Sequence, residues 1–220
     1  MAYSSARGVQ LPITNTPLRV LDVGTGSGLV ALMLAQRCPN AQIDAIDIDE
    51  AAVEQAKENV ERAQNTDRFT DRIQTYHARL QEWHGRQYDL IVSNPPYFRN
   101  SLKNPDKGRE LARHTDSLSY EELVKHSAAM LREGGQLAVI LPAEAESVMR
   151  ELAEQHSLFI TRVTRVYSKQ TKPVRRVLMA FMKFTMHNSQ CTIIEDTLVL
   201  EDEKGGRSAA YSELCKEFYL

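Results

Sequence analysis

The chain contains few cysteines, and their spacing is wrong for a metal site. Only three occur among 220 residues, namely Cys38, Cys191 and Cys215, and no CxxC pair is present. The six histidines also lack ligand spacings such as HxxxH. Structural zinc sites need such closely spaced ligands, so we predict reduced thiols and no metal.

Long apolar runs are missing as well. No stretch approaches the roughly 20 apolar residues that a membrane-spanning helix requires. The opening residues, MAYSSARGVQLPITNTP, lack the apolar core of a signal peptide. We therefore expect a cytoplasmic protein with no membrane partner. The length and ordinary composition predict a lead-in over residues 1–17 and one domain over 18–220, with a C-terminal extension from about residue 190.

The chain also lacks a strong net charge. The formal charge of −2 excludes a protein that binds nucleic acid by overall charge alone. The basic residues are nevertheless clustered, with seven and no acidic residue from Arg162 to Lys183. A second basic-leaning stretch runs from Arg99 to Arg113. A solvated face and a phosphate-binding surface explain these two clusters about equally well.

Apolar segments of strand and helix periodicity alternate along the chain. The expected strands are 18–23, 41–47, 72–78, 87–93, 136–141, 158–166 and 177–184, with 193–200 as an additional candidate. The expected helices are 29–37, 49–64, 119–131, 144–155 and 209–219. This alternation predicts an α/β fold with helices on both faces of a mostly parallel, seven-stranded sheet. Because residues 168–175 are too few for a parallel crossover, the last two strands should form an antiparallel hairpin.

A glycine turn follows the first expected strand. Its spacing, Gly24-x-Gly26-x-Gly28, differs from the GxGxxG of dinucleotide enzymes. Glycines permit a tight turn and the close approach of a ligand. Asp22 places a carboxylate before the turn, where it suits a cationic amine. Asp47 ends the second strand, where an acidic side chain can accept hydrogen bonds from both ribose hydroxyls.

The fourth expected strand ends in Asn94-Pro95-Pro96-Tyr97. In an open α/β sheet this is the carboxyl edge, where ligands bind. The prolines remove backbone donors and fix the chain, so carbonyl oxygens point into the site. The Asn94 side-chain oxygen and the Pro95 carbonyl can accept the two hydrogens of a planar exocyclic amine, while Tyr97 can stack on the ring that carries it. No strong general base is needed, because a reactive cofactor supplies the electrophile.

The glycine turn with its two acids resembles the S-adenosylmethionine (SAM) site of Rossmann-like class I methyltransferases. The resemblance implies SAM as cofactor, bound by Asp22, Gly24, Gly26, Gly28 and Asp47. The NPPY segment is similar to that of enzymes that methylate adenine N6 in nucleic acids or glutamine amides in proteins. It implies Asn94, Pro95, Pro96 and Tyr97 as the catalytic residues.

The chain is most similar to the bacterial tRNA adenine-N6 methyltransferases that modify the adenosine beside the anticodon of a valine tRNA. The similar segments are LDVGTGSGLVALMLAQR, QIDAIDID, YDLIVSNPPYF, RELARHT, PVRRVLMAF and YSELCKEFYL. They cover nearly the whole chain and imply a tRNA substrate methylated at N6 in the anticodon loop. Two departures are a TDG-type element that Met1–Pro17 does not show, and Ala78-Arg79 in place of an acid after the third strand.

Candidate RNA contacts extend from the NPPY segment. Phe98 and Arg99 follow it directly, and Arg113, Arg175 and Arg176 are candidates for phosphate contacts. Alternative readings are an N-methyltransferase of a protein glutamine or of ribosomal RNA, and a non-catalytic module that binds SAM or RNA. The sequence predicts neither the oligomeric state nor the bases that surround the target adenosine.

Overall fold

The structure, a computed structural model, describes residues 17–64, 70–95, 118–183 and 192–216. One sheet organises them, with strand order β3-β2-β1-β4-β5-β7-β6-β8. The strands are β1 (Leu18–Val23), β2 (Ala41–Asp47), β3 (Ile73–His77), β4 (Tyr88–Ser93), β5 (Leu131–Pro142), β6 (Leu158–Tyr167), β7 (Arg176–Lys183) and β8 (Ile194–Val199). The helices are α1 (Leu29–Arg37), α2 (Glu50–Gln64), α3 (Tyr120–Met130), α4 (Glu146–Gln155) and α5 (Ala209–Cys215), with short 3-10 turns at Thr70–Arg72, Leu80–Glu82 and Ala143–Ala145.

The strand directions confirm the predicted mixed sheet. Strands β1 to β5 pair in parallel, and β7 pairs antiparallel with both β5 and β6. The additional candidate strand is present as β8, which pairs in parallel with β6 and brings the sheet to eight strands. The carboxyl ends of β1 to β6 and of β8, together with the start of β7, therefore lie at one edge of the sheet.

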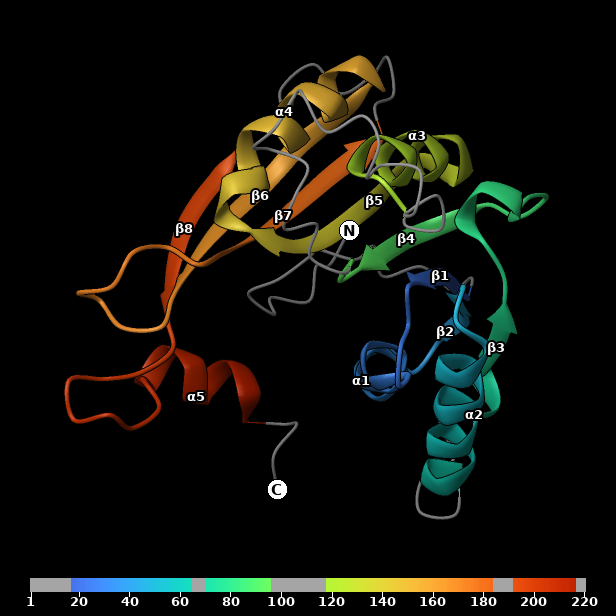
Figure 1. Cartoon of the computed structure of the whole chain (residues 1–220), viewed down its shortest axis with the longest axis horizontal. Helices are drawn as coiled ribbons and strands as arrows, with labels where there is room; N and C mark the ends of the chain where they lie inside the picture. The colour runs from blue at the N-terminus through green and yellow to red at the C-terminus, as the bar shows by residue number, and fades with distance from the viewer. Residues whose placement is uncertain (1–16, 65–69, 96–117, 184–191, 217–220) are drawn as a thin grey trace, which may run out of the picture.

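Helices cover both faces of the sheet, as Figure 1 shows. Alternate residues of a strand point to opposite faces, so neighbouring residues of β1 belong to different cores. Val20 packs with Ala31 and Ala35 of α1, whereas Leu21 packs with Leu123 and other residues on the side of α3 and α4. All five side chains are fully buried, which fixes the register of β1 between its neighbours.

Strand β5 begins at Leu131 rather than at Gln136, which corrects the sequence-based boundary. Gly134 and Gly135, which follow the expected end of the helix, lie inside the strand. Gly134 has a φ of 73°, and a Cβ on Gly135 would meet the Tyr88 carbonyl oxygen at 3.0 Å. The pairing of β4 with β5 shifts register between Tyr88 and Leu90. The two glycines thus allow β5 to begin irregularly, with the backbone of β4 close to it.

A buried polar cluster fixes the start of β4. The Asp44 carboxylate of β2 accepts hydrogen bonds from Arg86 Nη1 (2.6 Å) and Tyr88 Oη (2.8 Å). Trp83 Nε1 donates to Tyr88 Oη at 2.7 Å, and the Arg86 guanidinium lies over the rings of Tyr76 and Trp83. Because every buried polar group in this cluster has a partner, the cluster holds β4 firmly against β2 and β3.

Candidate active site

Three chain segments meet where β1, β2 and β4 end. Val23, the last residue of β1, is the parallel partner of Ile46 in β2 and of Ser93 in β4. The residues that follow these three are Gly24, Asp47 and Asn94, so the sheet register brings them side by side. The Ser93 hydroxyl donates to the Val23 carbonyl oxygen at 2.9 Å and ties β4 to β1. This is the point where the strand order reverses, which is where open α/β sheets bind their ligands.

The glycine turn leaves open space in front of its backbone. Gly24 and Gly26 have φ values of 70° and 55°, in the left-handed region that favours glycine. The amides of Gly24 and Thr25 donate to the Ile46 carbonyl oxygen at 2.9 and 3.0 Å, so the turn is anchored to β2. A Cβ placed on Gly24 or Gly26 would meet nothing within 4 Å. A ligand can therefore approach this backbone closely, as the SAM site requires.

Gly28 has a different role from the other two glycines. A Cβ at this position would lie 3.2 Å from the Cβ of Ala56 in α2, and its φ is 79°. Gly28 therefore allows α2 to pack closely against the start of α1, on the protein side of the turn. Its contact with the cofactor stays a prediction, and its packing against Ala56 is observed.

Replacing Gly28 should lower stability more than cofactor affinity. We expect Gly28→Ala to reduce the free energy of unfolding by about 1–3 kcal/mol, because the alanine adopts a left-handed backbone and crowds Ala56. Urea unfolding with and without SAM measures both quantities. Gly24→Ala is the matched control, because it carries the same backbone strain without the contact to α2. Equal losses of stability in the two variants would contradict the packing role.

Asp22 is a buried carboxylate with only 1% of its surface exposed. Burial raises its pKa to about 6, although hydrogen bonds from the Thr25 hydroxyl (2.7 Å) and from the Ala31 backbone lower it. The negative charge of Asp47 raises it further. Within the described residues, no basic side chain pairs with Asp22. A buried carboxylate without a cationic partner among these residues could hold the ammonium group of SAM, as the sequence predicts.

Asp47 is already oriented by the glycine turn. Its Oδ2 accepts a hydrogen bond from the Gly26 amide at 2.8 Å, and its Oδ1 accepts one from the Asp49 amide at 3.0 Å. Each carboxylate oxygen can accept a second hydrogen bond. The half-buried side chain can therefore bind two ribose hydroxyls without moving, which also fits the cofactor.

Asn94 and Pro95 stand at the end of β4 as predicted. Asn94 is exposed and Pro95 is buried, so the amide is available at the edge while the proline is fixed within the fold. Pro96, Tyr97, Phe98, Arg99 and Arg113 lie outside the described residues. Arg175 is exposed and Arg176 half-buried, at the same edge of the sheet beside the end of β5.

Sequence reasoning missed Thr25 as a member of the site. Its side chain is buried at 6% exposure and holds the Asp22 carboxylate through a 2.7 Å hydrogen bond. The feature of the sequence that could have indicated this role is a hydroxyl residue between Gly24 and Gly26.

Among the described residues, no group of histidine, cysteine or acidic side chains could hold a metal. The described helices include none with the length and hydropathy to cross a membrane.

Comparison with known proteins finds relatives that match most of the chain. The model of the methyltransferase small domain matches residues 10–162. A Flavobacterium johnsoniae protein named tRNA1(Val) (adenine(37)-N6)-methyltransferase is 40% identical over 216 residues, which cover 97% of this chain and 88% of the relative. A Bacteroides thetaiotaomicron protein of the same name is 42% identical over 204 residues, which cover 92% of this chain and 82% of the relative.

Solved structures support the fold. A protein from Agrobacterium tumefaciens described as a predicted O-methyltransferase superposes with a TM-score of 0.72. The match covers 94% of this chain and 92% of that one, at 16% sequence identity. The described sheet therefore has the class I methyltransferase architecture.

Proposed function

Because the chain belongs to the family of tRNA1(Val) (adenine(37)-N6)-methyltransferases, we propose that it methylates the exocyclic N6 amine of an adenosine in the anticodon loop of a tRNA. SAM is the methyl donor. The observation that carries the proposal is the sheet register that brings Gly24, Asp47 and Asn94 to one edge. A cofactor on the first two positions would lie beside an amine held by the third.

Different residues of the site would bind different parts of the cofactor. Asp22 would bind the ammonium of SAM, and Asp47 would bind the ribose hydroxyls. Gly24 and Gly26 leave room for the molecule between these two carboxylates. When bound, SAM supplies an electrophilic methyl group, so the protein needs to orient the nucleophile rather than to activate it strongly.

Asn94 and Pro95 would orient the target amine. The Asn94 side-chain oxygen and the Pro95 carbonyl oxygen would each accept one N6 hydrogen, which turns the nitrogen lone pair toward the methyl group. Pro96 and Tyr97 would complete this subsite, with Tyr97 stacked on the adenine. An adenine extruded from a single-stranded loop costs less free energy than one flipped from a duplex, which favours an anticodon-loop target.

The remaining sequence candidates extend the proposal to the rest of the RNA. Phe98 and Arg99 would hold the extruded nucleotide, and Arg113, Arg175 and Arg176 would contact phosphates. A tRNA substrate also supports a cytoplasmic location, which we propose for this protein.

Incubation with labelled SAM and tRNA that lacks the modification tests the function. Digestion to nucleosides and mass analysis should reveal N6-methyladenosine. Transfer to a protein glutamine or to ribosomal RNA, with none to tRNA, would replace the proposed substrate. SAM binding in a thermal-shift assay without any transfer would indicate a non-catalytic binding module.

A further inference from the structure

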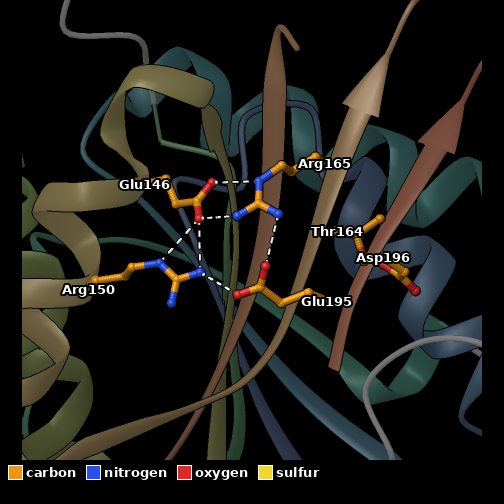
Figure 2. A network of polar contacts seen from close by, with 6 residues as sticks. All are labelled: Glu146, Arg150, Thr164, Arg165, Glu195 and Asp196. Atoms are coloured by element: carbon orange, nitrogen blue, oxygen red, sulfur yellow. Dashed lines mark hydrogen bonds and ion pairs between the residues drawn. The ribbon is translucent and has the colours of Figure 1, made fainter. Parts of the chain in front are cut away.

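An ion-pair cluster joins the C-terminal strand β8 to the rest of the sheet. Arg165 of β6 binds Glu146 of α4 at 2.7 Å and Glu195 of β8 at 2.9 Å. Arg150 of α4 binds the same two carboxylates, each at 2.9 Å. Figure 2 shows the four side chains closing a ring of alternating charge. Two arginines, one on β6 and one on α4, are therefore neutralised within the fold, and Arg165 belongs to the basic stretch 162–183.

Three more residues of that stretch are bound internally. Arg162 forms an ion pair with Asp196 of β8. Lys169 pairs with Glu201 at 3.3 Å, and Lys183 Nζ donates to a backbone carbonyl oxygen at 2.9 Å. These contacts leave the charge of the stretch concentrated where β6 ends and β7 begins.

The carboxylates that pair with these basic residues come largely from the C-terminal extension. Glu195 and Asp196 lie on β8, and Glu201 follows it. They neutralise the basic residues of β6 and Lys169, which lies near the start of the connection to β7. We name residues 168–176 the basic loop. Its side chains Lys172 and Arg175 are exposed. Neither of them forms an ion pair with another described residue.

Backbone contacts from both sides fix the shape of the basic loop. The Glu201 amide donates to the Ser168 carbonyl oxygen at 2.9 Å, which extends the contact between β8 and β6 beyond the strands. The Arg175 amide donates to the Val166 carbonyl oxygen, and the Arg175 carbonyl oxygen accepts from the Ala143 amide, both at 3.2 Å. The loop is therefore preorganised, which lowers the entropy cost of binding a ligand.

The basic loop lies at the same edge of the sheet as the proposed catalytic position. Arg176 pairs with Pro142 at the end of β5, and β5 is the neighbour of β4, whose end carries Asn94. Ser93 pairs with Val139 of β5 and Val139 pairs with Met179 of β7, so Arg176 lies two strands across and three residues further along the sheet. With about 4.8 Å between strands and about 3.3 Å per residue, the backbones of Ser93 and Arg176 are roughly 14 Å apart. An RNA strand that continues from a base held at Asn94 along this edge can bring its phosphates to the basic loop.

We propose that the basic loop binds the phosphate backbone of the RNA beside the target nucleotide, and that the carboxylates of the C-terminal extension confine phosphate binding to this edge of the sheet. Lys172 and Arg175 would make the contacts. The inference rests on the proposed function for the identity of the RNA. It adds a role for β8 and its flanking acid, which lie outside the matched methyltransferase domain at residues 10–162.

The double variant Lys172→Ala/Arg175→Ala tests this surface. Binding of unmodified tRNA, measured without turnover at several salt concentrations, should show a salt slope shallower by about 1.4–1.8, because two phosphate contacts are lost. The KM for tRNA should rise about tenfold at moderate salt. The kcat at saturating tRNA, the Kd for SAM and the melting temperature should stay as in the wild type.

Two control variants remove basic side chains from other parts of the fold. Lys57→Ala/Arg62→Ala removes one exposed lysine and one exposed arginine from α2, and it should leave the slope unchanged. Arg162→Ala removes a residue already paired with Asp196, and it should not change the slope either. A wild-type slope in the basic-loop variant, or an equal change in the α2 variant, would overturn the proposal. The absence of any methyl transfer by the wild type would contradict the proposed function instead, while the binding slope would still decide the role of the loop.

Discussion

Replacing Asn94 by alanine should abolish turnover while leaving cofactor binding intact. The variant loses the side-chain oxygen that would accept one N6 hydrogen, so the lone pair of the amine is no longer held toward the methyl group. Loss of one such positioned group typically lowers kcat by about 100- to 1,000-fold. Single-turnover transfer to tRNA and titration of the enzyme with SAM measure the two effects separately.

Asn94→Asp is the matched control, because it keeps an acceptor oxygen of the same reach. We expect its loss of activity to be smaller than that of the alanine variant. Neither substitution should unfold the protein, since Asn94 is exposed and β4 is fixed by the hydrogen bond from Ser93 to Val23. An alanine variant with a near wild-type rate would exclude the proposed orientation of the amine.

The sequence predicted the strands that carry the candidate site because their signals are local. The residues of the site lie at the ends of the apolar segments that become β1, β2 and β4, or directly after them. Once the order β2-β1-β4 is formed, parallel pairing must bring Gly24, Asp47 and Asn94 to one edge. A parallel register joins strand ends without further information from side chains.

Longer-range features were not predictable in this way. The basic residues of β6 gave no sign that they are paired, because Glu195 and Asp196 lie some 30 positions further along the chain. The same holds for Asp44, whose partner Arg86 is 42 positions away. Local periodicity identifies strands, but the partners of charged side chains depend on which strands become neighbours.

Replacing Asp22 by asparagine should weaken SAM binding and raise the free energy of unfolding at neutral pH. Asparagine keeps an oxygen that can accept the hydrogen bond from Thr25, but it carries no charge. We expect the Kd for SAM to rise by about 10- to 100-fold, which is the contribution of one charged hydrogen bond. The same variant should be more stable than the wild type at neutral pH. Isothermal titration with SAM and urea unfolding at several pH values test both effects.

The sign of the stability effect follows from the raised pKa of Asp22. Its carboxyl has an ordinary value of 3.8 and titrates at about 6 in the fold. Between these values the folded chain binds more protons than the unfolded chain, so the free energy of unfolding falls as the pH rises. Above pH 6 the cost of the buried charge is complete and amounts to about 3 kcal/mol. The gain in Asp22→Asn should therefore approach this figure at pH 7 and vanish near pH 4.

Cofactor affinity should have the opposite dependence on pH. Binding of an ammonium group requires ionised Asp22, whereas an α-amino group stays protonated at and below pH 6. The Kd for SAM should thus rise about tenfold for each pH unit below 6 in the wild type, and it should be nearly constant in Asp22→Asn. A wild-type Kd that does not change between pH 7 and pH 5 would show that Asp22 does not bind the cation. The buried charge lowers the stability of the empty fold, and we expect the bound cofactor to compensate for this loss.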